Sequence, residues 1–278
     1  LEAEWARSRL QQWLAYAADR GANCVQFGLI GSTDPHRAVW TADDNNFWGK
    51  FKDSEPSAER VDGKMGGALW PNWQLTASGY TGVWARANTR AELFAAIQRR
   101  EVYATTGPRI KIRLFAGWGF EKSDLTRSDF AKWGYAKGVT MGGLLSSDPK
   151  ESTPRFMVKA TKDPEGGNLE RAQIIKGWRD RNGTLHEKIY DVDFATASTG
   201  EAELTAYWQD PDFDNGEHAF YYLRVLEIPT KRWTSYDAEK YVVTLPTATP
   251  KMTQERAYSS PIWYKPSKWP VCPSARAG

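Results

Sequence analysis

The stretch RAQIIKGWRDRNGTLHEKIYDVDF, residues 171–194, decides the fold class. Residues 171–178 and 187–194 alternate between apolar and polar side chains, as β-strands with one buried face do. Between them lies Asn182-Gly183, a dipeptide that favours a tight hairpin turn because both residues tolerate a positive φ. The stretch therefore predicts an antiparallel β-hairpin.

Similar alternating runs lie on both sides of this hairpin. Turn-forming sequences such as Asp163–Gly167 and Asn215-Gly216 separate them. Six or more strands without a convincing helix predict an antiparallel β-sandwich. The additional runs are RIKIRLFAGW (109–118), RFMVKAT (155–161), AELTAYW (202–208) and AFYYLRVLEI (219–228).

The N-terminal part begins with a helix and a strand. Leu10, Trp13 and Leu14 have the spacing of one helical face, which predicts a helix over residues 1–20. Residues 25–30 alternate and end in Gly-Ser-Thr-Asp, which predicts a strand. A helix and a strand with polar residues at its carboxyl end are typical of an α/β barrel or open sheet, whose chemistry lies at that end.

The next segment, residues 37–80, has weak periodicity and is interpreted as a long loop insertion. We then expect a strand over 80–86 and a helix over 88–100, with Thr89 and Glu92 at capping-box spacing. The buried face of that helix is predicted to be Leu93, Phe94 and Ile97.

A short strand in VYATTGPR (102–109) and the break at Gly107-Pro108 end this part of the chain. We therefore expect two domains: an α/β segment over residues 1–111 and the sandwich over residues 112–278.

Composition narrows the classes of function. The 278 residues are 41% hydrophobic and carry a net charge of only +3, which gives no electrostatic case for nucleic acid or an anionic membrane. No run approaches the ~20 apolar residues of a membrane span. Cys24 and Cys272 lie at opposite ends of the sequence and predict two buried thiols, with one disulfide as the alternative.

Asp34 and His36, in GLIGSTDPH (28–36), are the candidate metal ligands. A carboxylate and an imidazole suit Zn²⁺, Mn²⁺ or Fe²⁺, and residues i and i+2 of an extended segment point the same way. The alternative interpretation is an Asx-turn after a strand, with His36 in solvent. D-x-H is common by chance, so the spacing alone favours the turn.

Three further residues are candidates for substrate contact. Arg109 follows the predicted strand and could reach an anionic group, or it could form a salt bridge between the two domains. Trp70 and Trp73, with Tyr80, could line the mouth of a pocket, although packing of the long loop is an equally good interpretation.

Other polar clusters favour structural interpretations. Asp43, Asp44 and Asn45 could bind an ion or a sugar hydroxyl, but we expect a solvated turn. The segment 209–218 resembles a calcium loop, yet its glycine is one place late, so we expect a hairpin turn. We also interpret five more polar residues as structural: His186, His218, Arg256, Ser259 and Ser260.

Several stretches together resemble the family called domain of unknown function 3604, which is related to the PHP (polymerase and histidinol phosphatase) metal-dependent hydrolases. No single stretch is specific, but the combination is. The stretches are FGLIGSTDPH (27–36), DNNFWGK (44–50), NTRAELF to REVYATTGPRI (88–110), VTMGGLL (139–145), QIIKGW (173–178), FYYLRVLEIPTKRWTSYDA (220–238) and ERAYSSPIWY (255–264).

The resemblance implies a remnant of a distorted TIM-like barrel, followed by a β-sandwich. It also implies a di- or trinuclear metal site that activates water to hydrolyse a phosphoester, or an ester or amide, of a small-molecule substrate. Asp34-Pro35-His36 matches the late D-x-H of that family, so Asp34 and His36 would be metal ligands and Asp34 a catalytic residue. A periplasmic or secreted location is implied by resemblance alone.

The sequence departs from the family pattern because no H-x-H precedes Asp34, and only 33 residues do. We therefore expect this chain to be the C-terminal portion of the enzyme, inactive alone, with the missing barrel segment supplied as a separate chain or lost by cleavage. The alternative is a non-catalytic β-sandwich binding or structural module attached to a silent barrel remnant.

Overall fold

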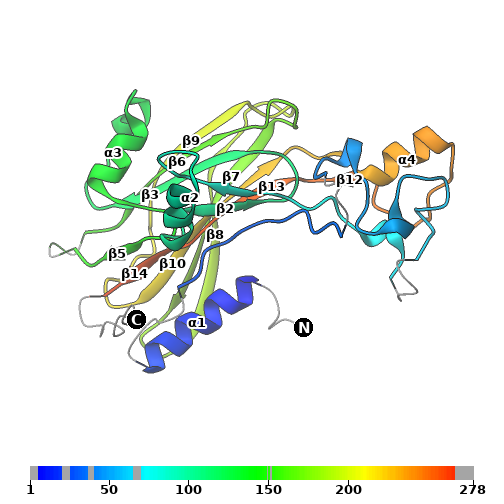
Figure 1. Cartoon of the computed structure of the whole chain (residues 1–278). Helices are drawn as coiled ribbons and strands as arrows, with labels where there is room; N and C mark the ends of the chain where they lie inside the picture. The colour runs from blue at the N-terminus through cyan, green and yellow to red at the C-terminus, as the bar shows by residue number, and fades with distance from the viewer. Residues whose placement is uncertain are drawn as a thin grey trace.

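The computed structural model describes residues 6–20, 26–36, 41–64, 70–148, 150 and 152–266. This part of the chain is a mixed α/β structure built on antiparallel sheets (Figure 1). A sheet of eight strands and a sheet of four strands face each other across a shared apolar core. A two-stranded sheet, β11 (Thr230–Lys231) with β12 (Met252–Thr253), lies apart from them.

Strand β10 (His218–Glu227) is the centre of the larger sheet. On one side it pairs with β7, and on the other side it pairs with β13 and β14 end to end, all antiparallel. The remaining strands extend the sheet outward from these. The other strands of this sheet are β1 (Thr81–Val83), β2 (Val102–Thr105), β5 (Leu144–Ser146), β7 (Leu169–Arg179), β8 (Leu185–Phe194), β13 (Arg256–Ser259) and β14 (Ile262–Lys265).

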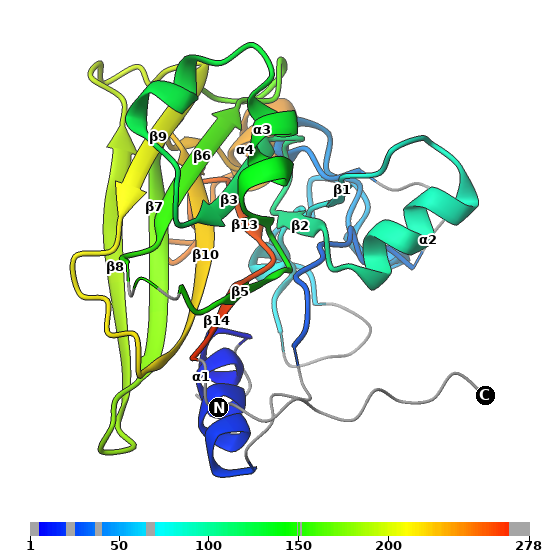
Figure 2. The ribbon, with the colours of Figure 1, turned by 90° about the vertical axis from the view of Figure 1, so that its left-hand side faces the viewer.

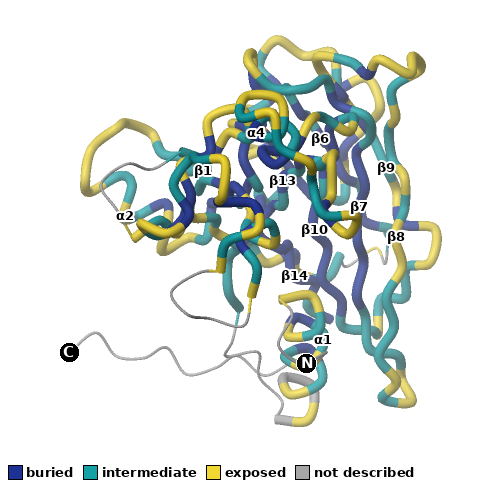
Figure 3. Tube along the Cα trace, turned by 90° about the vertical axis from the view of Figure 1, so that its right-hand side faces the viewer, coloured by how far each residue is buried: buried dark blue, intermediate teal, exposed yellow. Residues whose placement is uncertain are grey.

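The smaller sheet has the order β4-β3-β6-β9. Alternation decides its two faces: Ile112, Leu114 and Ala116 of β3 enter the core between the sheets, whereas Phe115 packs on the opposite face against Phe130. Figure 3 shows the buried stretches along β7, β10 and β13 of the larger sheet. The strands are β3 (Lys111–Gly117), β4 (Val139–Thr140), β6 (Arg155–Thr161) and β9 (Glu203–Gln209).

The hairpin predicted for residues 171–194 is confirmed as β7–β8. Gly183 has φ +90°, a backbone conformation that a side chain would strain. The Gly183 N–H donates to the Asp180 carbonyl at 3.0 Å, and the Asp180 N–H donates to the Thr184 carbonyl at 3.0 Å. The Asn-Gly dipeptide thus closes the turn that the sequence predicts.

The described residues form four α-helices (Figures 1 and 2). The predicted first helix is confirmed over α1 (Ala6–Arg20), whose Leu10 and Leu14 pack on Ile175 of β7 and Phe220 of β10. The expectation of no helix after residue 110 is wrong, because α3 (Phe130–Lys137) and α4 (Trp233–Tyr241) form there. Helix α4 buries Thr234 and Asp237 beside Trp233, so its buried face carries little apolar periodicity.

Helix α2 (Arg90–Gln98) begins as predicted, with the Thr89 hydroxyl accepting a hydrogen bond from the Glu92 N–H at 3.4 Å. Its predicted buried face is wrong. Phe94 is 61% exposed and Ile97 is 50% exposed, whereas Ala96 is fully buried. The helix contacts β1, and the residue that it buries is Ala96.

The predicted long loop is irregular where it is described. It contains three short 3-10 helices: η2 (Asp44–Asn46), η3 (Lys52–Ser54) and η5 (Asn72–Gln74). A fourth, η6 (Lys122–Thr126), precedes α3. In Figure 1, η2 lies next to α4 at one end of the molecule, and these two elements are in contact.

The described residues form no closed barrel. β1 and β2, from the predicted segment 1–111, lie in the same sheet as β10 and β13 of the predicted sandwich. How far the two segments fold independently stays a prediction. No helix in the described ranges combines the length and apolar character that crossing a bilayer requires.

Candidate functional site

The strand predicted over residues 25–30 is wrong for the residues described, since residues 26–36 form no strand and no backbone ladder. Side-chain hydroxyls replace the ladder. The Leu29 N–H donates to Ser260 Oγ at 2.9 Å, and Ser260 Oγ donates to the Val102 carbonyl at 2.6 Å. The Thr81 hydroxyl donates to the Gly31 carbonyl at 2.6 Å. These bonds hold the segment beside β1, β2 and β13.

Asp34 and His36 lie at the end of this segment. Asp34 has φ +51°, a left-handed conformation that costs a non-glycine residue energy and that concentrates at functional sites. His36 Nε2 lies 3.8 Å from Asp34 Oδ1, and both side chains are more than half exposed. The His36 ring packs on Phe51, with ring centroids 4.2 Å apart. The two polar groups therefore face each other on the surface.

Lys50 contacts the other oxygen of the Asp34 carboxylate. Its Nζ lies 3.5 Å from Asp34 Oδ2, and it donates to the Thr33 carbonyl at 3.0 Å and to the Ser78 hydroxyl. The Lys50 carbonyl accepts the His36 N–H at 2.8 Å. Burial lowers the pKa of Lys50, and the neighbouring Asp34 carboxylate opposes that shift. We call Asp34, His36, Lys50 and Ser78 the Asp34 corner.

The Asp34 corner can supply two ligands to one metal ion. Zn–N and Zn–O bonds of about 2.1 Å at a tetrahedral angle place two donor atoms about 3.4 Å apart. The 3.8 Å between Asp34 Oδ1 and His36 Nε2 is close to that separation. Within the described ranges, no three His, Cys, Asp or Glu residues are grouped to hold a metal. That Asp34 and His36 bind a metal stays a prediction.

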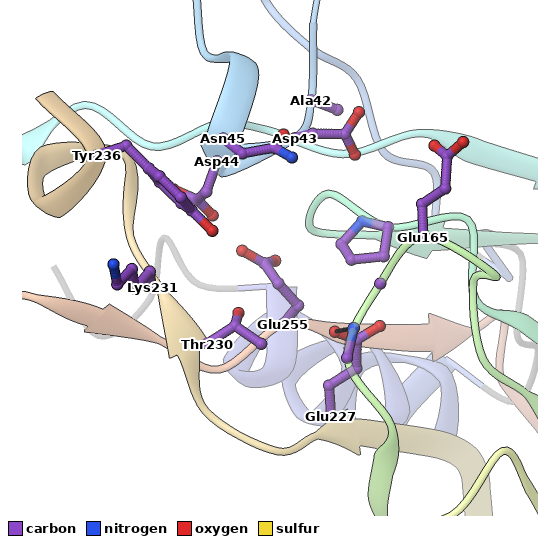
Figure 4. A pocket seen from close by; sticks show the side chains of 13 residues that line it. Ala42, Asp43, Asp44, Asn45, Glu165, Glu227, Thr230, Lys231, Tyr236 and Glu255 are labelled. Carbon is purple, nitrogen blue, oxygen red and sulfur yellow. Dashed lines mark hydrogen bonds between the residues drawn. The ribbon is translucent and has the colours of Figure 1, made fainter. Parts of the chain in front are cut away.

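A second polar site is the acidic cavity, of about 140 Å³, at the end of the molecule that holds α4 (Figure 4). The carboxyl groups of Asp44 and Glu255 and the hydroxyl of Tyr236 point toward one another in Figure 4. Asp43 and Glu165 lie at the opposite rim. The lining residues are Ala42, Asp43, Asp44, Asn45, Pro108, Glu165, Gly166, Gly167, Glu227, Thr230, Lys231, Tyr236 and Glu255.

Burial raises the pKa values of two carboxyl groups of the acidic cavity. Burial, together with a hydrogen bond to the Asp44 carboxyl, raises the pKa of Glu255 to about 8, while the Thr106 hydroxyl opposes the shift. Burial also raises the pKa of Glu227 to about 7, although the Gly167 N–H donates to Glu227 Oε2 at 3.1 Å. Both groups therefore take up protons near neutral pH.

A model of the family described as Protein of unknown function (DUF3604) matches residues 1–198 and 193–266. The chain belongs to the DUF3604 family. No curated protein matches the chain, and no solved structure does. Membership of DUF3604 is therefore the established relationship, and it extends over nearly the whole chain.

Three residues predicted to contact substrate in this DUF3604 chain lie away from the Asp34 corner. The Arg109 guanidinium binds Asp163 at 3.0 Å and Glu165 at 2.9 Å, which is a salt bridge to the β6–β7 turn. Trp70 is 62% exposed. Trp73 packs on the cluster of Phe47, Val61, Ala77 and Trp233. Neither tryptophan lines the acidic cavity or a second cavity on the other side of Tyr236.

The hairpin expected for residues 209–218 is wrong, because β9 lies in the smaller sheet and β10 in the larger one, so the segment connects the two sheets. Asp210 binds Lys176, Asp212 binds Lys188 and Asp214 binds Arg181, so each carboxylate has a cationic partner. The turn joins β9 to β10.

The remaining polar residues have structural contacts. His186 stacks on Trp178, with ring centroids 5.0 Å apart, and its Nε2 lies 2.9 Å from Asp180. Ser259 and Ser260 are fully buried, and Ser259 Oγ accepts the Leu223 N–H at 2.9 Å. ERAYSSPIWY forms two strands, β13 and β14. Cys24 and Cys272 lie outside the described residues.

Sequence reasoning overlooked several residues of these sites. Lys50, Glu227, Tyr236 and Glu255 received no prediction, and Asp44 was expected in a solvated turn. Asp44 in fact caps α4, since its Oδ1 accepts the Trp233 N–H at 2.8 Å. A signal for Glu227 was present in the sequence. It is a carboxylate that interrupts the apolar run of β10, where a charge is costly to bury.

Proposed function

We propose that the Asp34 corner is part of the centre of a metal-dependent hydrolase that acts on a small-molecule phosphoester, with a carboxylic ester or amide as the second substrate class. The observation that carries the proposal is the left-handed backbone of Asp34, which brings Oδ1 to 3.8 Å from His36 Nε2. Strain of this kind persists where surrounding structure maintains it. Lys50 and the hydroxyl contacts along 26–36 supply that structure.

Each residue of the corner has a role in this proposal. Asp34 and His36 would hold a divalent metal such as Zn²⁺, Mn²⁺ or Fe²⁺, and a bound metal would supply hydroxide from a water and polarise the substrate. Lys50 orients the Asp34 carboxylate by binding Oδ2, so that Oδ1 is directed to His36. Asp34 also accepts the proton of the attacking water. A remnant of a TIM-like barrel, completed by a further segment, would supply the missing ligands.

The experiment measures metal content and hydrolysis together. The longest natural chain that contains these residues is dialysed against Zn²⁺ or Mn²⁺, and its metal content and its rates with bis(p-nitrophenyl) phosphate and p-nitrophenyl acetate are determined. We expect Asp34→Asn and His36→Gln to lower metal content and to abolish hydrolysis. Asp53→Asn, an exposed aspartate in the same loop, is the matched control and should change neither.

The competing function is a non-catalytic β-sandwich module. It is favoured by the single core shared by the two sheets, which forms without any residue of the Asp34 corner. If Asp34→Asn and His36→Gln leave both metal content and hydrolysis unchanged, the hydrolase proposal fails and the module becomes the better proposal.

A further inference from the structure

The acidic cavity is built by segments far apart in the sequence. The short helix η2 supplies Asp44, the end of β10 supplies Glu227, and Glu255 lies between β12 and β13. Tyr236 of α4 closes one side, as Figure 4 shows. The cavity shares none of its lining residues with the Asp34 corner. An inference about it is therefore independent of the proposed hydrolase.

Negative charge exceeds positive charge around this cavity. Five carboxyl groups line it, and the lining ammonium of Lys231 is bound at 2.6 Å to Glu239, which is not a lining residue. Arg232 is the nearby buried cation that interacts with Asp44 and Glu255. It donates to the Trp73 carbonyl at 2.7 Å and to the Leu75 carbonyl at 2.6 Å. These contacts leave the inner carboxyl groups short of cationic partners.

Glu227 gives a second and independent indication of a ligand. Its side chain is 1% exposed and lines the cavity, and Oε1 is a buried atom with no hydrogen-bond partner. An unsatisfied buried carboxylate oxygen is costly, so a native structure that keeps one has a reason for it. A donor group in the cavity would satisfy Oε1, whereas the Gly167 N–H already satisfies Oε2.

The volume and the lining side chains of the cavity indicate which cation fits. Its volume of about 140 Å³ matches a small organic molecule, since a cavity of about 150 Å³ holds one benzene. In the parts of the chain that are described, no three metal-binding side chains converge, which disfavours a bare metal ion. The Tyr236 ring offers an aromatic wall for a cation or an alkyl chain.

We propose that the acidic cavity binds a primary ammonium group carried on a short aliphatic chain, with Glu227 and Glu255 as the carboxylate acceptors. The three N–H donors of an ammonium need three acceptors, and Asp44 or the Tyr236 oxygen supplies the third. Charge-assisted hydrogen bonds in a buried cavity are the strong kind.

The proposal includes a dependence on pH. Burial raises the pKa of Glu255 and of Glu227 to about 8 and about 7, so both are protonated in the empty cavity below neutral pH. The charged groups around Glu255 are Asp44, Glu227 and Arg232, and those around Glu227 are Glu255, Asp163 and Lys162. An ammonium binds the ionised carboxylates. Affinity should therefore rise with pH from 6 to 8.5, with proton release on binding.

The test is calorimetric titration of the full chain with n-butylammonium chloride, with n-butanol as the neutral analogue. At pH 8.5 we expect binding at least about ten-fold tighter than at pH 6, with a heat that depends on the buffer as proton release requires. Glu227→Gln should weaken binding about ten-fold or more, because it removes a charged acceptor. Glu255→Gln is the second variant, and Glu203→Gln, exposed on β9, is the control.

Several results would overturn the proposal. The first is no binding of n-butylammonium at about 10 mM at any pH. The second is binding of n-butanol as tight as that of n-butylammonium. The third is an affinity of Glu227→Gln and Glu255→Gln equal to that of the unaltered protein. Displacement of the amine by micromolar Ca²⁺ or Mg²⁺ would instead identify a metal site. None of these results bears on metal content at the Asp34 corner, so the two proposals fail separately.

Discussion

Asp210→Asn should lower the free energy of unfolding more than any other single aspartate change in the β9–β10 turn. Lys176 Nζ lies 2.7 Å from Asp210 Oδ2, and the two side chains are 2% and 0% exposed. Tyr221 also donates its hydroxyl to Asp210, at 2.8 Å. Asparagine keeps the shape of the side chain but leaves the Lys176 charge buried without a counter-charge.

The structure sets the size of the effect. Two unit charges 2.7 Å apart attract by about 6 kcal/mol at an effective dielectric constant of about 20. Lys176 keeps its bond to the Asp212 carbonyl, at 2.6 Å, and its contact with the Trp178 ring. We therefore expect a loss below that value, about 3–5 kcal/mol in the free energy of unfolding, which is typical of a broken buried pair.

Urea denaturation followed by tryptophan fluorescence measures this loss. The matched control is Asp212→Asn in the same turn, because Asp212 binds Lys188 where both side chains are 41–50% exposed. That pair should contribute about 1 kcal/mol or less. The double variant Lys176→Met with Asp210→Leu should recover most of the stability, since it removes both charges. Equal losses for Asp210→Asn and Asp212→Asn would refute the reasoning.

Three further predictions concern the core, the hairpin and the acidic cavity. Leu14→Ala should lower the free energy of unfolding by about 2–5 kcal/mol because Leu14 is 1% exposed in the cluster with Phe220, and urea denaturation checks this. Gly183→Ala should cost about 1–2 kcal/mol in the same assay because φ is +90°, whereas Gly119→Ala, with open space around it, should cost less. The folded protein holds a proton on Glu227 up to about pH 7, but the unfolded chain loses it near the ordinary pKa of 4.5. Stability should therefore fall from pH 4.5 to pH 7, by about 3 kcal/mol at most, and Glu227→Gln should remove that part of the slope.

The strands were predictable because their signal is local. The predicted runs that form β3, β6, β7, β8, β9 and β10 alternate in sequence, and in β3 the alternation separates the side chains that enter the core between the sheets from those on the opposite face. The hairpin of β7 and β8 was predictable for the same reason, since its turn residues lie between its two strands. Family membership was predictable from dispersed short stretches, and the match over residues 1–198 and 193–266 confirms it.

The errors occur where the partner is distant in sequence or the buried face is polar. Helix α4 was missed because Asp237 is buried against Arg60, and charged pairs do not produce apolar periodicity. The acidic cavity was missed because Asp44 meets α4 across 189 residues of sequence. In the part of the chain described here, nothing tests the metal predicted for Asp34 and His36, and it stays a prediction.

The hydrogen bond from Leu29 to Ser260 Oγ has a consequence for the order of folding. It joins residues 231 positions apart, and Ser260 also binds Val102. Contacts of such long range close large loops and form late. During synthesis from the N-terminus, Leu29 gains this partner only after the last strands have left the ribosome. Any chain shortened before Ser260 would lack this anchor of the segment that leads to the Asp34 corner and would keep the contacts with Lys50 and Thr81.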